Sequence, residues 1–186
     1  MSKIGLLFGS FNPIHNGHLA IAQAAQEAGC NDVWLVVQAR NPYKQQRDLP
    51  AFQHRKAMVE RAVKPHPRVH VWETTQDPPH IISTLLTLRA QDSRHQYILL
   101  MGQDLVDSLP QWPDYLEVLA AAEIYCYPRI GGNGPKFTRS NIQHLKMPPV
   151  NISAGLIRER LAEGKPINGL TPLPVTKYIK DNKLYI

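Results

Sequence analysis

Two histidines three residues apart, His15 and His18, stand where an apolar run gives way to a turn. The run at residues 4–8 is typical of a buried strand, and the residues after it predict a tight turn and a helix that begins at Asn16 or Gly17. A helix begins with unpaired N–H groups and the positive end of its dipole, and such a terminus attracts phosphate. The spacing therefore predicts that both imidazoles face a bound anion.

The turn before the histidines is also suited to a ligand. Gly9 lets the backbone approach a bound group closely, and Pro13 stiffens the turn. A lone histidine at a helix start is usually a cap or a surface residue. Two histidines that bracket a glycine, after a phenylalanine and a proline, form a far more restrictive pattern.

A second candidate anion site lies near residues 151–161. Ser153 is suited to cap a helix that stops at Gly164, and Arg158 can lean back toward the N-terminus of that helix. Taken alone, the segment also fits an ordinary capped helix with a solvated arginine. Together, the two helix ends and the two histidines indicate attack on the α-phosphate of a nucleotide, with pyrophosphate leaving. A phosphate acceptor is already ionised, so this chemistry needs positioning and charge stabilisation and no general base.

The rest of the chain predicts how these residues are held. Continuous apolar runs separated by helical stretches are typical of parallel strands covered on both faces, so we expect an α/β fold, a Rossmann-like doubly wound parallel sheet with helices on both faces. Ligands bind such sheets beyond the carboxyl ends of the strands. The expected strands are residues 4–8, 33–37, 69–72, 97–101 and 124–127, and the expected helices are 17–28, 51–64, 80–91 and 113–122, with a terminal helix from 172 to 185. Glycines and prolines in residues 131–149 predict a long, mobile loop.

Composition limits the function classes. The 186 residues fit one domain, 1–186, with a helical segment at about 151–186 packed on it. Lys and Arg exceed Asp and Glu by 21 minus 15, or +6, which favours anionic ligands, but no nucleic-acid-binding pattern accompanies the charge. Cys30 and Cys126 lack metal or disulfide spacing and are expected in the core. We expect no leader and no membrane segment, so the sequence predicts a cytoplasmic protein. The sequence does not predict the oligomeric state.

The pattern GxFxPxHxGH, from Gly9 to His18, resembles the signature of the nucleotidyltransferase superfamily with a (T/H)xGH core. Members of that superfamily transfer a nucleotidyl group from ATP or CTP to a phosphate- or carboxylate-bearing acceptor. Its C-terminal ISSTxIR signature is matched at Ile152, Ser153, Ile157 and Arg158, whereas Ala154-Gly155-Leu156 stand where the superfamily has small hydroxyl residues.

Further landmarks resemble the bacterial nicotinate-nucleotide adenylyltransferase family nearly from end to end. They are Asn41-Pro42-Tyr43-Lys44; Arg55, Met58 and Ala62; Met101-Gly102-Gln103-Asp104 with Leu109-Pro110-Gln111-Trp112; Pro128-Arg129; and Tyr178-Ile179 with Leu184-Tyr185. The resemblance implies an adenylyltransferase that joins ATP and nicotinate mononucleotide, giving deamido-NAD and pyrophosphate in NAD biosynthesis.

The resemblance also implies roles for individual residues. Those implied to be catalytic are His15, His18, Lys44 and Arg158. The implied ATP-binding residues are these four with Gly9, Ser10, Phe11, Gly102, Asp104, Ser153 and Ile157, where Asp104 would address a ribose. The implied acceptor-binding residues are Thr84, Trp112, which would stack on the pyridine ring, and Arg129. Mg²⁺ would arrive on the phosphates of ATP, so no dedicated metal site in the protein is expected.

One departure from the family bears on the acceptor. Where the family has an SYTxxTL stretch that holds the nicotinate carboxylate, this chain has Pro79-His80-Ile81-Ile82-Ser83-Thr84-Leu85. The choice of acid over amide therefore stays open, and nicotinamide mononucleotide and phosphopantetheine are alternative acceptors. A nucleotide-binding regulatory module or a basic RNA-binding domain with structural histidines is the alternative from another class.

Overall fold

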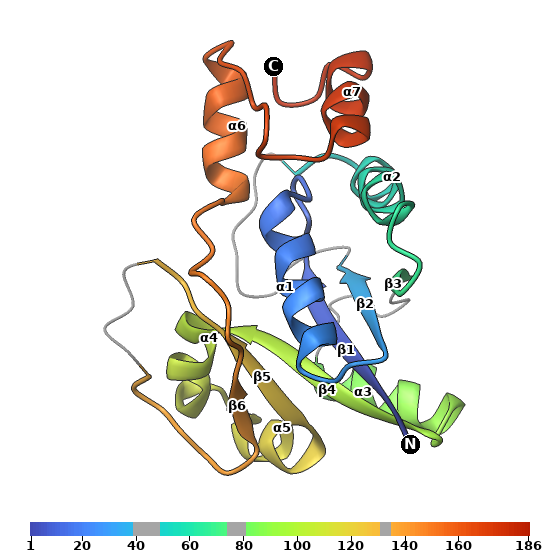
Figure 1. Ribbon diagram of the computed structural model, residues 1–186, viewed down its shortest axis with the longest axis vertical. Helices are drawn as coiled ribbons and strands as arrows, with labels where there is room; N and C mark the ends of the chain where they lie inside the picture. The colour runs from blue at the N-terminus through green and yellow to red at the C-terminus, as the bar shows by residue number, and fades with distance from the viewer. Residues whose placement is uncertain (39–48, 74–80, 131–134) are drawn as a thin grey trace.

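A computed structural model of the protein describes residues 1–38, 49–73, 81–130 and 135–186. Within these ranges the strands form one six-stranded sheet in the order β3-β2-β1-β4-β5-β6, and each neighbouring pair is parallel (Figure 1). The strands are β1 (Ser2–Gly9), β2 (Asp32–Val37), β3 (Val69–Glu73), β4 (His95–Gly102), β5 (Glu123–Tyr127) and β6 (Ile142–His144). The helices are α1 (Asn16–Glu27), α2 (Phe52–Val63), α3 (Ile81–Gln91), α4 (Gln103–Ser108), the 3₁₀ turn η1 (Leu109–Gln111), α5 (Tyr115–Ala121), α6 (Ala154–Ala162) and α7 (Leu173–Asp181).

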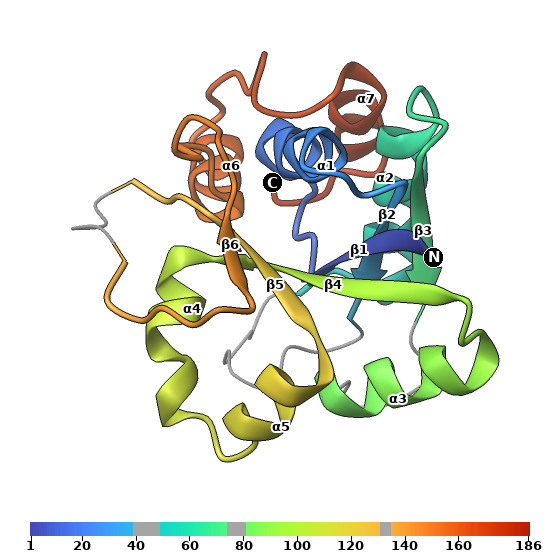
Figure 2. The ribbon, with the colours of Figure 1, turned by 60° about the horizontal axis from the view of Figure 1, so that its bottom comes forward.

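Helices cover both faces of the sheet, as the buried side chains show. On one face, Ile21 of α1, Met58 of α2 and Val175 of α7 belong to one apolar cluster. On the other face, Leu85 of α3 and Val118 of α5 belong to a second. Figure 2 shows α3, α4 and α5 together on that second face. This arrangement confirms the predicted doubly wound α/β fold.

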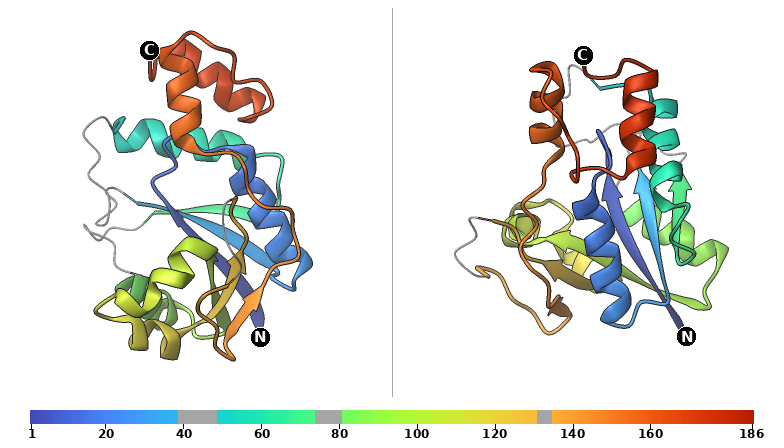
Figure 3. Two further views of the ribbon diagram at one scale, coloured as in Figure 1. Left: turned by 90° about the vertical axis from the view of Figure 1, so that its left-hand side faces the viewer. Right: turned by 45° about the horizontal axis from the view of Figure 1, so that its top comes forward.

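The C-terminal helices lie beyond the carboxyl ends of the strands (Figure 3). Ser153 caps α6 as predicted, because its Oγ accepts a hydrogen bond from the Leu156 N–H at 3.1 Å. Gly164 follows the end of that helix with a φ of +67°, as a helix stop requires. Cys30 and Cys126 are both buried free thiols, also as predicted. No helix in the described part of the chain is long and apolar enough to cross a membrane.

Two short elements differ from the sequence prediction. The stretch 131–149, expected to be a loop, contains β6 at the edge of the sheet, and Arg129 pairs with Val150 beyond it. The six-residue helix α4 directly follows β4 and was not predicted. The terminal helix also ends earlier than the expected range, at Asp181. Three to six residues are too few to show a hydrophobic period, so the pattern could not reveal β6 or α4.

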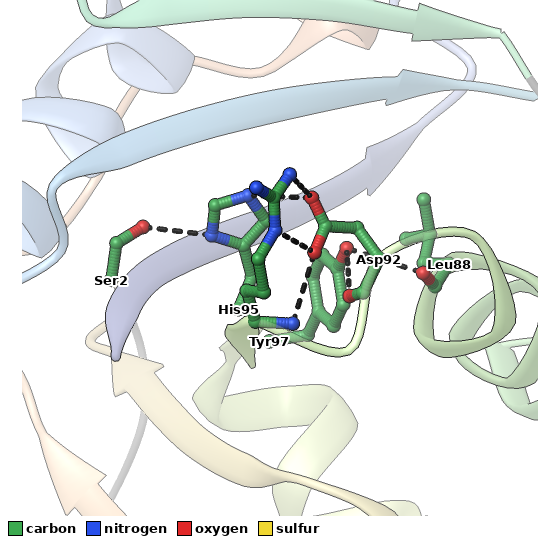
Figure 4. A network of polar contacts seen from close by, with 6 residues as sticks. Ser2, Leu88, Asp92, His95 and Tyr97 are labelled. Carbon is green, nitrogen blue, oxygen red and sulfur yellow. Dashed lines mark hydrogen bonds and ion pairs between the residues drawn. The ribbon is translucent and has the colours of Figure 1, made fainter.

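A polar network fastens the amino end of the sheet (Figure 4). Ser2 Oγ lies 2.9 Å from His95 Nδ1, and His95 Nε2 lies 3.4 Å from an Asp92 carboxylate oxygen. The Tyr97 hydroxyl lies 3.3 Å from the carbonyl oxygens of Leu88 and Asp92. These contacts join the start of β1 to the turn before β4, at the opposite end of the strands from the predicted ligand site.

Candidate active site

The turn between β1 and α1, residues 10–15, is the predicted phosphate turn, and it lies where the strand order of the sheet reverses. From β1 the chain proceeds outward to β2 and β3, and β4 then returns to the other side of β1. Because Leu6 pairs with Leu99, Gly9 and Gly102, each three residues further on, end neighbouring strands at the same edge. This reversal point is where ligands bind in open parallel sheets.

The two histidines form a stacked pair at this edge. His15 is the residue that caps α1 and is 5% exposed, and its ring lies 3.7 Å from that of His18, centre to centre, at an angle of 23°. Phe11 meets His18 edge-on, with ring centres 5.0 Å apart. Gly9 makes room for Phe11, since a Cβ at Gly9 would lie 3.1 Å from the phenyl ring. The turn thus supports His18 from one side with His15 and from another with Phe11.

One hydrogen bond fixes the protonation of His18. The His15 backbone N–H donates to His18 Nδ1 at 3.2 Å, so that nitrogen carries no proton. A neutral His18 therefore carries its proton on Nε2 and can donate it to an anion.

The amides at the start of α1 are mostly occupied, contrary to the sequence prediction. The Asn16 N–H donates to the Leu170 carbonyl at 2.9 Å, and the His18 N–H donates to the His15 carbonyl at 2.9 Å. With the His15 N–H bound to the His18 ring, three amides here already have acceptors. The imidazoles are thus better placed than these amides to donate to a phosphate.

Both imidazoles are uncharged at neutral pH. Burial, aided by the nearby positive charge of Arg129, lowers the pKa of His15 to about 4. Burial, followed by His15 and then Arg129, lowers the pKa of His18 well below its ordinary value. His15 Nδ1 is buried and has no hydrogen-bond partner in the described part of the chain, which is uncommon for a native polar atom. His15 and His18 are therefore neutral imidazoles near the positive charge of Arg129.

The buried histidines should make the folded state sensitive to acid. The folded pKa of His15 is about 4 against 6.5 when unfolded, so the unfolded chain binds an extra proton as the pH falls through this window. We expect the free energy of unfolding to drop by about 2–3 kcal/mol between pH 7.5 and 4.5 because of His15 alone. Urea unfolding at both pH values checks this against His15→Asn, whose drop should be smaller by that amount. An equal drop in both proteins would contradict the assignment.

The start of α6 packs against the turn. Arg158 Nη1 donates to the Asn12 carbonyl at 2.8 Å, and Ile157 beside it is fully buried. A Cβ at Gly17 would lie 2.7 Å from Val150 Cγ1 and 3.0 Å from His15 Nδ1, so only glycine fits between the two segments. The structure therefore brings the second predicted phosphate element against the first.

Residues at the ends of β4 and β5 complete this edge. Arg129 Nε lies 3.4 Å from an Asp104 carboxylate oxygen. A Cβ at Gly102 would lie 2.5 Å from that oxygen and 3.1 Å from Arg129 Nε. The charge of Arg129 also acts on both histidines, so this edge of the sheet lies near the histidine pair.

The remaining predicted residues are less closely tied to the histidines. Thr84 lies in α3, 1% exposed, and its hydroxyl is buried without a hydrogen-bond partner in the described part of the chain. Trp112 is half-buried against the α3–α5 side of the sheet. Lys44 lies outside the described residues, as does His80. Among the described residues, no three His, Cys, Asp or Glu side chains gather in a way that could hold a metal ion.

Three residues that support the turn were given no role by the sequence reasoning. Asn12 accepts hydrogen bonds from Arg158 and, through its side chain, from Tyr185 at 2.7 Å. Arg55 donates to the Ser10 carbonyl at 2.7 Å. Arg55 did carry a signal, because it stands on the apolar face of a predicted helix, where a charged residue is unusual. The link between Asn12 and Tyr185 has no local signal at all.

The sequence matches the cytidylyltransferase-like family over residues 6–160. It is 35% identical over 190 residues to a probable nicotinate-nucleotide adenylyltransferase of Flavobacterium johnsoniae, covering 98% of each chain. It is 30% identical over 192 residues to the nicotinate-nucleotide adenylyltransferase of Bacillus subtilis, covering 100% of this chain and 99% of that one.

Solved structures agree in fold. Plasmodium falciparum nicotinic acid mononucleotide adenylyltransferase complexed with NaAD superposes with a TM-score of 0.80 at 17% identity, covering 100% of this chain and 98% of that one. The same protein complexed with APC also gives a TM-score of 0.80, at 16% identity. At these identities the likeness is one of fold, whereas the sequence matches extend over the motifs and nearly the whole chain. The chain therefore belongs to the cytidylyltransferase-like family and, within it, to the nicotinate-nucleotide adenylyltransferases.

Proposed function

We propose that this protein transfers the adenylyl group of ATP to nicotinate mononucleotide, giving deamido-NAD and pyrophosphate. The observation that carries the proposal is the stacked pair of neutral histidines at the strand-order reversal, with a donor at His18 Nε2. The relatives named for this activity support the choice of substrates. The whole chain, residues 1–186, acts as one catalytic domain in this proposal.

The reaction is a displacement at phosphorus. A phosphate oxygen of the mononucleotide attacks the α-phosphorus of ATP, a new P–O bond forms, and the bond to pyrophosphate breaks. The attacking phosphate is already ionised, so no group has to remove a proton from it. The protein contributes by holding the two substrates in line and by stabilising the charge that builds on the phosphate oxygens.

The described residues divide this work. His18 Nε2–H donates to a phosphate oxygen, and His15 lies against the same ring. Arg158 has one guanidinium nitrogen on the Asn12 carbonyl, and we assign its other N–H groups to the triphosphate. ATP would enter as its magnesium complex, and the ion would supply positive charge on the phosphates.

The other assignments follow the predicted roles. Lys44 joins Arg158 on the triphosphate, with the start of α6 at Ser153 facing the same phosphates. Asp104 binds a ribose, which requires its ion pair with Arg129 to open. Arg129 then binds the acceptor mononucleotide. Trp112 stacks on the pyridine ring, and the region of Thr84 holds the ring substituent.

Mass spectrometry of the products tests the function. Purified protein is incubated with Mg²⁺ and ATP plus, separately, nicotinate mononucleotide, nicotinamide mononucleotide or phosphopantetheine. We expect deamido-NAD to dominate. Dominance of NAD or of dephospho-coenzyme A would keep adenylyl transfer and overturn the acceptor, and no product with any acceptor would overturn the proposed function.

A further inference from the structure

The segment after α7 returns to the phosphate turn. The Tyr185 hydroxyl donates to Asn12 Oδ1 at 2.7 Å, across 173 positions of sequence. Burial raises the pKa of Tyr185 far above neutrality, so its hydroxyl keeps the proton that it donates. Lys183 and Tyr185 have φ values of +50° and +65°, which side chains other than glycine rarely adopt. The hydrogen bond from Tyr185 to Asn12 therefore stabilises these unusual backbone conformations, which the C-terminal segment would not keep without it.

Arg55 holds the same turn from the other side. Its guanidinium, 1% exposed, donates to the carbonyls of Ser10 and Gln38, each at 2.7 Å, and to that of Pro50 at 3.2 Å. Ser10 follows β1 and Gln38 follows β2, so Arg55 joins the carboxyl ends of two strands. Arg158 and Tyr185 both donate to Asn12, two residues after the Ser10 carbonyl that Arg55 binds, so the three side chains hold one short stretch of the turn.

The turn matters because it carries Phe11. That residue has a φ of +44° and lies between Ser10, held by Arg55, and Asn12, held by Arg158 and Tyr185. Its ring meets the ring of His18. A shift of the turn therefore moves a ring that supports the proposed phosphate donor, and small misplacements at a reacting centre reduce rates strongly.

We propose that Tyr185 is a positioning residue of the active site, acting through Asn12 on the turn that supports His18. The inference rests on the proposed function for its kinetic readout. This role explains the Leu184-Tyr185 landmark, to which the sequence pattern assigned no function. Tyr185 touches neither substrate in this proposal, and its hydroxyl acts only through Asn12.

Tyr185→Phe removes the hydroxyl and keeps the ring. We expect kcat/KM for ATP to fall about 5- to 10-fold, the scale of one hydrogen bond. The matched control is Tyr97→Phe, which also removes a hydrogen-bonded hydroxyl, but one that belongs to the network at the amino end of the sheet (Figure 4). Both variants should lower the melting temperature, whereas only Tyr185→Phe should slow turnover. Turnover within twofold of the unsubstituted protein in Tyr185→Phe would overturn the proposal.

A second background tests the path through Asn12. In Asn12→Ala, adding Tyr185→Phe should change kcat/KM less than twofold, because the acceptor of the hydroxyl is already gone. A further 5- to 10-fold loss there would show that Tyr185 acts by another route and would overturn the proposal.

The two proposals can fail separately. If the unsubstituted protein makes no dinucleotide, the proposed function fails alone. The same variants are then compared by the NMR signals of the His18 imidazole ring, which Phe11 contacts edge-on. A shifted His18 signal in Tyr185→Phe, with Tyr97→Phe unchanged, supports positioning, and equal His18 signals in all three proteins overturn it.

Discussion

Replacing His18 with alanine should lower kcat by about 10²- to 10³-fold, the usual cost of losing one donor to a developing charge. The neutral ring donates through Nε2, because Nδ1 already accepts the His15 N–H. Because the donor acts mainly on charge that builds in the transition state, KM for ATP should change less than about threefold. Steady-state kinetics with varied ATP measures both constants. A loss confined to KM would mean that His18 only binds ATP.

His18 also has a structural task, so the alanine variant needs a control. Its Nδ1 accepts the His15 N–H and thereby helps to shape the start of α1. In His18→Asn, the amide oxygen can take over that acceptor role, but nothing replaces Nε2. We expect His18→Asn to regain stability relative to His18→Ala in thermal unfolding and to stay as slow in turnover. Recovery of turnover in His18→Asn would move the role of His18 from chemistry to helix capping.

Replacing Arg158 with alanine should lower kcat/KM for ATP by about 10²- to 10³-fold, because a positioned arginine on a transferring phosphoryl group contributes on this scale or above. Arg158→Lys keeps the charge but cannot bind the Asn12 carbonyl and a phosphate with a planar fork, so it should recover only part of the loss.

Arg160 provides a control on the same helix. It is bound to the Pro166 carbonyl at the surface, and its replacement by alanine should leave kcat/KM within twofold. If Arg160→Ala and Arg158→Ala lose activity equally, the effect belongs to the net charge of α6 and the assignment of Arg158 is wrong.

Most of the fold could be predicted because the strands are buried on both faces. The runs at 33–37 and 97–101 are continuous apolar segments, and they lie within β2 and β4. Helices such as α1 were displaced by only one residue from the expected range, since their apolar faces span several turns. The two elements that were not predicted, β6 and α4, are short and partly exposed. Pairing with β5 defines β6, and the end of β4 sets the start of α4, more than their own sequences do.

The candidate site was predictable where one motif contained the interacting residues. His15, His18 and Gly17 lie within four positions, so their pattern indicated a common place. The stacking of the rings and the occupied amides did not follow from it, because they depend on Leu170 and on the burial that the whole fold provides. The role of Asn12 was hidden for the same reason, since both of its partners are more than 140 positions away.

Those distant partners bear on how the site forms during folding. The bonds from Arg158 and Tyr185 to Asn12 close segments of 146 and 173 residues, and contacts that close long segments are slow to form. The β1–β2 pairing can be in place before they are. Full nucleotide affinity should consequently appear late in refolding, after the signals of the sheet. A nucleotide present at about 100 times its Kd would then add about 2.7 kcal/mol to the stability of the completed chain, and none to a sheet whose C-terminal segment is still undocked.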